Sequence, residues 1–212
     1  MTADQSDTMP FQGCVFCARA ALTGILAETE HFILLADHAP LVEGHLLIVP
    51  RQHLACYGAL PPALEADFLA AKRRAGAFLR ARYREPIFFE HGVFRQTVFH
   101  AHLHAIPFGA VRFGVRALAA EHGRSVGSLS DVRAWYAEQG HYFYIEEPGD
   151  DGEDGIHAGV FPPREERYFH VLGMVRASAD RLEGFLPAPE RRLAGQAKVR
   201  ALIEAWRAHA DA

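Results

Sequence analysis

The chain has 212 residues, of which half are apolar or aromatic and 23% are charged, a composition typical of a globular protein with a substantial core. The formal net charge is −4 and the sequence contains no basic run, so we expect no nucleic-acid partner. No apolar stretch approaches the roughly 20 residues that a membrane helix needs, so we expect no membrane partner.

The N-terminus and the cysteines indicate a reducing compartment. Residues 1–10 carry neither the basic nor the apolar segment of a secretory signal, and three cysteines do not make a disulfide scaffold. We therefore expect a cytoplasmic protein, with Cys56 as a small buried hydrophobe. Cys14 and Cys17 form a C-x-x-C pair, whose spacing suits a zinc ion or a redox pair. A redox pair normally lies in a βαβ unit, and no such pattern surrounds these residues.

The first half of the chain predicts an α+β fold, with an antiparallel sheet and one long helix on its face. The predicted elements are a strand at 31–36, a turn at 37–40, a strand at 45–49, a helix at 61–83 and a strand at 87–90. A proline near its start and an apolar stripe indicate the helix. That stripe contains Leu64, Phe68, Leu69, Ala75, Phe78 and Leu79.

The stretch from Gln96 to Pro107 is the most informative in the chain. It reads Q-T-V-F-H-A-H-L-H-A-I-P, so that His100, His102 and His104 alternate with small or apolar residues. Because successive side chains of a strand point to opposite faces, this spacing predicts three imidazoles in a row on one face. We expect the apolar face to be buried and the histidine face to line a cleft. The alternative is a histidine-rich surface strand.

Beyond residue 110 the signals are weaker. The predicted elements are a helix from 129 or 130 to about 138 with Ser130 as N-cap, strands at 141–145 and 156–161, an acidic loop at 146–155, and helices at 164–178 and 190–210. The two strands are expected to form a hairpin, and the acidic loop to be solvated. We predict a core at 11–110 and a C-terminal extension at 111–212 that packs on it.

Two ordered motifs resemble the histidine-triad (HIT) superfamily. One is H-A-H-L-H-A-I at 100–106, preceded by Gln96, and the other is L-L-A-D-H-A-P-L-V-E-G-H-L-L-I-V-P-R-Q-H at 34–53. The second matches the family's apolar strand ending in Asp, its Gly-His step and its Pro-x-x-His. The resemblance covers about residues 11–110 and implies a zinc-bearing, HIT-like hydrolase with a nucleotide substrate.

The resemblance implies roles for five residues. His102 is expected to attack the α-phosphorus of a nucleotide and form a nucleotidyl-histidine, with its other ring nitrogen donating to a backbone carbonyl. His104 is expected to bind the phosphate oxygens, and Gln96, on the same face, to reach the α-phosphate or the leaving oxygen. Asp37 corresponds to the ribose-binding acid, although capping of the following turn explains it equally well. Leu35 either packs against the base or belongs to the core.

The same resemblance implies a structural zinc ion held by Cys14, Cys17, His53 and His100. Zinc-bearing members, and the related galactose-1-phosphate uridylyltransferases, carry a C-x-x-C near the start, a His after the Pro-x-x and the first triad His. Four protein ligands fill a tetrahedral site and leave no position for substrate, so such a metal would be structural and not catalytic.

Some features depart from the family pattern or choose between its branches. Arg95 stands where many members have glycine before the Gln, and its side chain is a candidate phosphate contact. Pro107 resembles the dinucleotide-hydrolase branch, and His104, in place of the Gln of transferases and phosphorylases, favours hydrolysis.

We therefore predict a nucleotide hydrolase or nucleotidyltransferase that cleaves phosphoanhydride or phosphoramidate bonds. The alternatives are a nucleotide-binding regulatory module with little catalysis and a biosynthetic nucleotidyltransferase. Many relatives are two-fold dimers, so a homodimer is one expectation, and occupation of that surface by residues 110–212 is the other.

Overall fold

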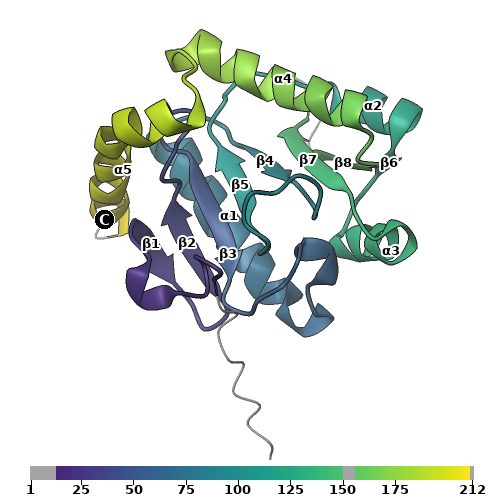
Figure 1. Ribbon diagram of the computed structural model, residues 1–212, viewed down its shortest axis with the longest axis horizontal. Helices are drawn as coiled ribbons and strands as arrows, with labels where there is room; N and C mark the ends of the chain where they lie inside the picture. Colours follow the sequence, from purple (N-terminus) through teal and green to yellow (C-terminus); the bar gives the residue numbers. More distant parts are fainter. Residues whose placement is uncertain (1–12, 150–155, 211–212) are drawn as a thin grey trace, which may run out of the picture.

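An antiparallel sheet of eight strands organises the described part of the chain, residues 13–149 and 156–210 of the computed structural model (Figure 1). The strand order is β1-β2-β3-β5-β4-β7-β8-β6, and each ladder between neighbours is antiparallel. The strands are β1 (Ile25–Glu28), β2 (Phe32–Ala36), β3 (Leu46–Pro50), β4 (Ile87–Glu90), β5 (Leu103–Ile106), β6 (Arg124–Ser125), β7 (Phe143–Pro148) and β8 (Ile156–Phe161). The predicted α+β class is confirmed.

Helices cover both faces of this sheet. They are α1 (Glu65–Arg82), α2 (Val115–His122), α3 (Leu129–Gln139), α4 (Glu165–Glu183) and α5 (Ala188–Ala210), with 3-10 turns η1 (Arg19–Ala21), η2 (Tyr57–Ala59) and η3 (Pro62–Leu64). Phe78 of α1 and Trp206 of α5 pack in one core with Leu103, whereas Val175 of α4 packs in a second core with Phe89. In Figure 1, α4 crosses the top of the sheet and α5 stands beside β1 and β2. No helix in the described ranges combines the length and hydropathy that a bilayer crossing requires.

Strand register places one row of side chains on the face opposite α1. Leu47 of β3 and Phe89 of β4 are the direct neighbours of His104 in β5, and Phe89 lies opposite Ile145 of β7. Leu103 points the other way, into the core beneath α1. For β5, the predicted alternation between a histidine face and a buried apolar face is confirmed.

The histidine strand is shorter than the sequence predicts. β5 begins at Leu103, so that only His104 lies in it, while His100 and His102 precede it in an irregular segment. A longer ladder would need Pro50 of β3, which has no N–H to donate. The Pro50 carbonyl instead accepts a hydrogen bond from Nε2 of His100 at 2.8 Å. The prediction that all three histidines belong to one strand is therefore wrong for the first two, although the His102 ring still lies beside that of His104, with ring centroids 5.1 Å apart.

Residues after 110 continue the core sheet. β7 pairs with β4 on one side and forms the predicted hairpin with β8 on the other. The start of the predicted acidic loop belongs to β7, where Glu146 and Glu147 are buried, so the expectation of a solvated loop is wrong for these two. The Glu147 carboxylate accepts the N–H groups of Phe113 and Val115, where the positive end of the α2 dipole favours an anion. Positions 150–155 lie outside the described residues.

Some boundaries differ from those predicted, and β1, β6 and α2 have no counterpart among the predicted elements. α3 begins at Leu129, one of the two predicted starts, but its N-cap is Ser128 and not Ser130, because the Ser128 N–H donates to Oδ2 of Asp131 at 2.9 Å in a capping box. Leu69 of α1, predicted in the buried stripe, is 37% exposed. The end helices are longer than predicted, with α4 reaching Glu183 and α5 beginning at Ala188.

Candidate active site and metal centre

His102 lines a cavity with a volume of about 580 Å³. The sheet contributes His104 and Phe89, and the loop after β4 contributes His91. The remaining walls come from the turn after β2 and from α4, α5 and the segment that joins them. A volume in this range is typical of sites for small molecules such as nucleotides. The predicted cleft on the histidine face is therefore present.

The His102 ring is held by its own backbone. Its side chain is only 6% exposed, and Nδ1 lies 2.7 Å from the carbonyl oxygen of His100. In the neutral ring, Nδ1 carries the proton and donates it to this carbonyl, so Nε2 keeps a bare lone pair. The contact predicted from the sequence is thus present. The structure provides an oriented, unprotonated ring nitrogen in a residue that lines the cavity.

His45, which the sequence predicts only as the start of a strand, orients His104. Gly44 before it has φ +86°, a conformation that glycine adopts at little cost. The Leu41 N–H donates to Nδ1 of His45 at 3.2 Å, so the His45 proton is on Nε2, which donates to Nδ1 of His104 at 3.0 Å. Nε2 of neutral His104 therefore carries a proton, and this buried atom has no hydrogen-bond partner among the described residues. Such a donor suits an oxygen of a ligand in the cavity.

Asp37 has the capping role that the sequence predicts and also lines the cavity. Its Oδ1 accepts the N–H of Ala39 at 2.7 Å and so caps the turn after β2. Its Oδ2 lies 3.6 Å from Nε2 of His45 and 3.8 Å from Nδ1 of His104. Asp37 also lines the cavity, so one oxygen stabilises the turn while the other faces the histidine pair.

Two predicted nucleotide contacts lie elsewhere. Gln96 is 6% exposed and its amide donates to the Ala55 carbonyl at 2.9 Å, so it stabilises the loop after β3 and is absent from the described cavity lining. The same-face argument for it does not hold, because β5 begins seven residues later. Leu35 lies on the histidine face but is 3% exposed, in a core cluster with Leu47 and Phe16. It occupies the core position that the sequence left as its alternative role.

The loop between β4 and β5 brings further groups to the cavity. Arg95 lines it with φ +56°, a left-handed conformation that explains why glycine suits this position. His91 lies beside the triad, with ring centroids 5.8 Å from His104 and 6.4 Å from His102. Nδ1 of His91 is 3.0 Å from the hydroxyl oxygen of Tyr168, so α4 holds this ring in place.

Burial keeps four histidines of the cavity neutral. It lowers the pKa of His102 and of His45, and it holds the pKa of His104 well below its ordinary range. Burial, with a smaller contribution from His102, lowers the pKa of His91 to about 3. Neutral imidazole is the form with a bare ring nitrogen, and it is therefore the form that attacks phosphorus.

The four predicted metal ligands converge at the other end of the triad segment. The ligand atoms of Cys14, Cys17, His53 and His100 all lie within 4.8 Å of one another. Sγ of Cys14 is 3.4 Å from Nδ1 of His100, and Sγ of Cys17 is 3.3 Å from Nδ1 of His53. These separations are close to the roughly 3.6 Å between sulfur and nitrogen ligands of a tetrahedral zinc ion. Nε2 of His100 donates to the Pro50 carbonyl, which leaves Nδ1 for a metal.

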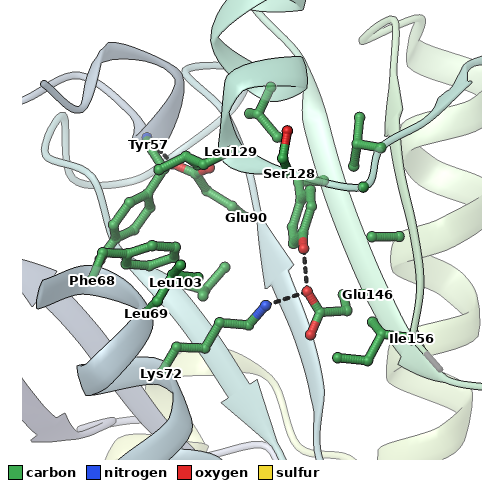
Figure 2. A pocket seen from close by; sticks show the side chains of 15 residues that line it. Tyr57, Phe68, Leu69, Lys72, Glu90, Leu103, Ser128, Leu129, Glu146 and Ile156 are labelled. Carbon is green, nitrogen blue, oxygen red and sulfur yellow. Dashed lines mark hydrogen bonds and ion pairs between the residues drawn. The ribbon is translucent and has the colours of Figure 1, made fainter. Parts of the chain in front are cut away.

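A second cavity, of about 250 Å³, lies on the α1 side of the sheet (Figure 2). Leu103 separates it from the histidine face, and none of the triad histidines lines it. Lys72 of α1 reaches across it to the carboxylate of Glu146, and Glu90 lies at its edge with its carboxylate accepting the N–H of Tyr57. These ionisable groups are bonded to protein partners, so the cavity carries no evident ligand site among the described residues.

The comparisons with known proteins identify the family of this chain. The HIT domain family matches residues 20–109, which contain the triad and His53. An uncharacterized HIT-like protein of Mycoplasma genitalium is 31% identical over 101 residues, which are 44% of this chain and 72% of that protein. One of Mycobacterium tuberculosis is 33% identical over 101 residues, 44% of this chain and 70% of that protein. The chain belongs to the HIT family, as its two motifs predict.

Solved structures include further proteins of this family. A Zn-bound histidine triad family protein from Mycobacterium smegmatis is 27% identical, covers 59% of this chain and 94% of its own, and has a TM-score of 0.41. A HIT family hydrolase from Clostridium thermocellum is 28% identical, covers 49% of this chain and 96% of its own, and has a TM-score of 0.40. In both, the likeness leaves a large part of this chain uncovered.

The residues that the sequence did not identify come mainly from the C-terminal helices. Tyr168 and Arg176 of α4 and Arg191 and Arg192 of α5 line the cavity. No local motif marks them, since their position depends on how α4 and α5 fold back over the sheet. His45, by contrast, stands in the Gly-His step of the second motif, and this step could have identified it as a site residue.

Proposed function

We propose that this protein is a nucleotide hydrolase or nucleotidyltransferase that cleaves its substrate at the α-phosphate through a nucleotidyl-histidine. The observation that carries the proposal is the His102 ring, with Nδ1 bonded to the His100 carbonyl and the residue lining a nucleotide-sized cavity. Membership of the HIT family supports a nucleotide-related activity.

The proposed reaction has two displacements at phosphorus. Nε2 of His102 forms a bond to the α-phosphorus, and the bond from this phosphorus to the leaving group breaks, with the electron pair departing on the leaving group. Water, or a second acceptor in a transferase, then forms a bond to the same phosphorus and displaces His102, giving its proton to solvent. A nucleoside monophosphate, or its ester with the acceptor, is released.

His104 and Asp37 support this chemistry. The unpartnered Nε2–H of His104 is a donor for a non-bridging oxygen, where negative charge develops in the transition state. The position of Asp37 at the same wall suits a ribose, whose two hydroxyls are donors for a carboxylate. Gln96, held by the Ala55 carbonyl, has no direct part in this proposal.

We also propose a structural zinc ion at Cys14, Cys17, His53 and His100. Two thiolates and two imidazole nitrogens are a common donor set for zinc, and the described geometry fits it. When bound, the metal would join the N-terminal segment to the triad segment and supply no step of the reaction. The three free thiols suit the cytoplasm, which is the proposed location.

The proposed division of the chain is a core at 11–110 and a C-terminal extension at 111–212. The proposed oligomeric state is a homodimer.

Replacement of the nucleophile tests the activity. His102→Asn should abolish release of nucleoside monophosphate from a dinucleoside tetraphosphate and from adenosine 5′-phosphoramidate. His141→Asn, at an exposed position outside the described cavity lining, should leave turnover unchanged. Undiminished turnover by the His102 variant would contradict the proposal. Tight nucleotide binding without turnover by the natural chain would favour the regulatory module instead.

A further inference from the structure

The cavity has a cationic wall that faces the triad. Its described lining contains four arginines and one carboxylate, Asp37. The four are Arg95 from the loop before the triad, Arg176 from α4, and Arg191 and Arg192 from α5. Three of them therefore come from the part of the chain that lies outside the residues matched by the HIT domain family.

Among the described residues, the three arginines of the helices form no ion pair of 4.0 Å or less with a carboxylate, although the charge of Asp37 acts on Arg191. Arg191 donates hydrogen bonds to the carbonyl oxygens of Ala39 at 3.0 Å and Leu186 at 2.8 Å. Its guanidinium also lies 5.2 Å from the ring centre of Phe185, and that of Arg176 lies 5.7 Å from the same ring. Two cations thus share one aromatic ring at the join between α4 and α5.

Such an arrangement is costly without an anion. Burial, together with the nearby charge of Arg176, lowers the pKa of Arg191, whereas Asp37 opposes this effect. Arg176 and Arg192 are exposed residues of the cavity lining. Planar guanidinium groups bind phosphate through paired hydrogen bonds, and a phosphate placed between them would remove the like-charge repulsion.

We propose that this wall binds the leaving group, and that the substrate is a nucleotide whose leaving group carries phosphate. The inference rests on the proposed function. In an in-line displacement the leaving group departs on the side of the phosphorus opposite the nucleophile. With His102 on the sheet side, the leaving group points toward the helices that carry the arginines. A phosphoanhydride therefore fits the cavity better than a phosphoramidate, whose leaving group is a neutral amine.

Comparing two substrates distinguishes binding of the leaving group from binding of the α-phosphate, because both substrates contain an α-phosphate. The paired variant Arg176→Gln with Arg192→Gln keeps Arg191 and its backbone contacts. We expect kcat/KM for a dinucleoside tetraphosphate to fall by roughly 10- to 100-fold, the loss typical of one or two charge-assisted hydrogen bonds. For adenosine 5′-phosphoramidate the change should stay below about 2-fold. Arg200→Gln, at an exposed position of α5 outside the cavity lining, is the matched control and should change neither.

Equal losses on both substrates, or no loss on either, would overturn the assignment. Calorimetric titration with inorganic tripolyphosphate measures anion binding without requiring catalysis. The natural chain should bind this anion and the paired variant should bind it at least 10-fold more weakly. If tripolyphosphate binds the natural chain and binds the paired variant more weakly, but neither substrate turns over, then the cationic wall is supported and the proposed function fails. If both substrates turn over and tripolyphosphate does not bind, the wall fails and the proposed function stands.

Discussion

Nε2 of His45 donates a hydrogen bond to Nδ1 of His104 at 3.0 Å, and this contact fixes which nitrogen of His104 carries the proton. The Leu41 N–H sets the tautomer of His45, and His45 in turn sets that of His104. The result is a single donor, the buried Nε2–H of His104, without a protein partner among the described residues.

His45 is therefore a positioning residue, and its replacement tests this relay. His45→Phe should lower kcat by roughly 10- to 100-fold with little change in KM, since residues that orient catalytic groups have effects of this size. His45→Gln offers an amide donor at a similar place and should recover part of kcat. Steady-state kinetics of the two variants measure the difference. Equal activity of the Phe and Gln variants would contradict the relay.

Glu90 should make the stability of the protein fall with rising pH. Burial raises the pKa of this carboxyl from 4.5 to about 7, against the opposing hydrogen bonds from Tyr142 and Tyr57. Between these two values the folded state keeps a proton that the unfolded chain releases, so the free energy of unfolding decreases as pH rises through this window. The loss is about 3 kcal/mol, complete above the folded pKa.

Urea unfolding of the natural chain and of Glu90→Gln, from pH 4.5 to 8, measures this effect. The amide mimics the protonated acid, so the variant should become more stable relative to the natural chain as pH rises. A stability difference that stays constant across this range would contradict the assignment.

The Lys72–Glu146 pair should matter for stability mainly because removing one partner leaves the other as an unpaired buried charge (Figure 2). The two side chains are 16% and 6% exposed, and Tyr144 donates to the same Glu146 oxygen. Lys72→Met leaves a buried carboxylate without its cation and should lower the free energy of unfolding by about 3–5 kcal/mol. Arg80, also on α1, forms an exposed pair with Glu85 beyond the end of the helix, and Arg80→Met should cost less than about 1 kcal/mol. Similar losses for both variants would show that the pair is not buried in solution.

The cysteine and histidine cluster predicts about one zinc ion per chain. Elemental analysis of the purified protein should find it, and Cys17→Ser should reduce the content well below one equivalent because a thiolate ligand is lost. Cys56, fully buried and with its pKa raised to about 12 by burial, lies in a different core cluster. Cys56→Ala should therefore keep the metal. A natural chain that takes up no zinc under saturating conditions would refute the site.

The two motifs and their resemblance to the HIT family were enough to predict that His102, His104 and Asp37 line one cavity. They were also enough to predict that Cys14, Cys17, His53 and His100 come together. Local spacing failed at Gln96, because alternation was extended through a segment in which Pro50 interrupts the ladder. Leu35 was ambiguous for a similar reason, since sequence does not show that Phe16 packs in the same cluster. Arg176 and Arg191 were beyond reach, because their place at the cavity follows from long-range packing of α4 and α5 on the sheet.

The stereochemical course at the α-phosphorus tests the role of His102 most directly. The measurement uses a substrate made chiral at this atom by sulfur and hydrolysed in isotopically labelled water. Two successive in-line displacements, first by Nε2 of His102 and then by water, each invert the configuration and together retain it. Retention is the predicted result, and inversion would contradict a nucleotidyl-histidine by showing that water attacks the substrate directly.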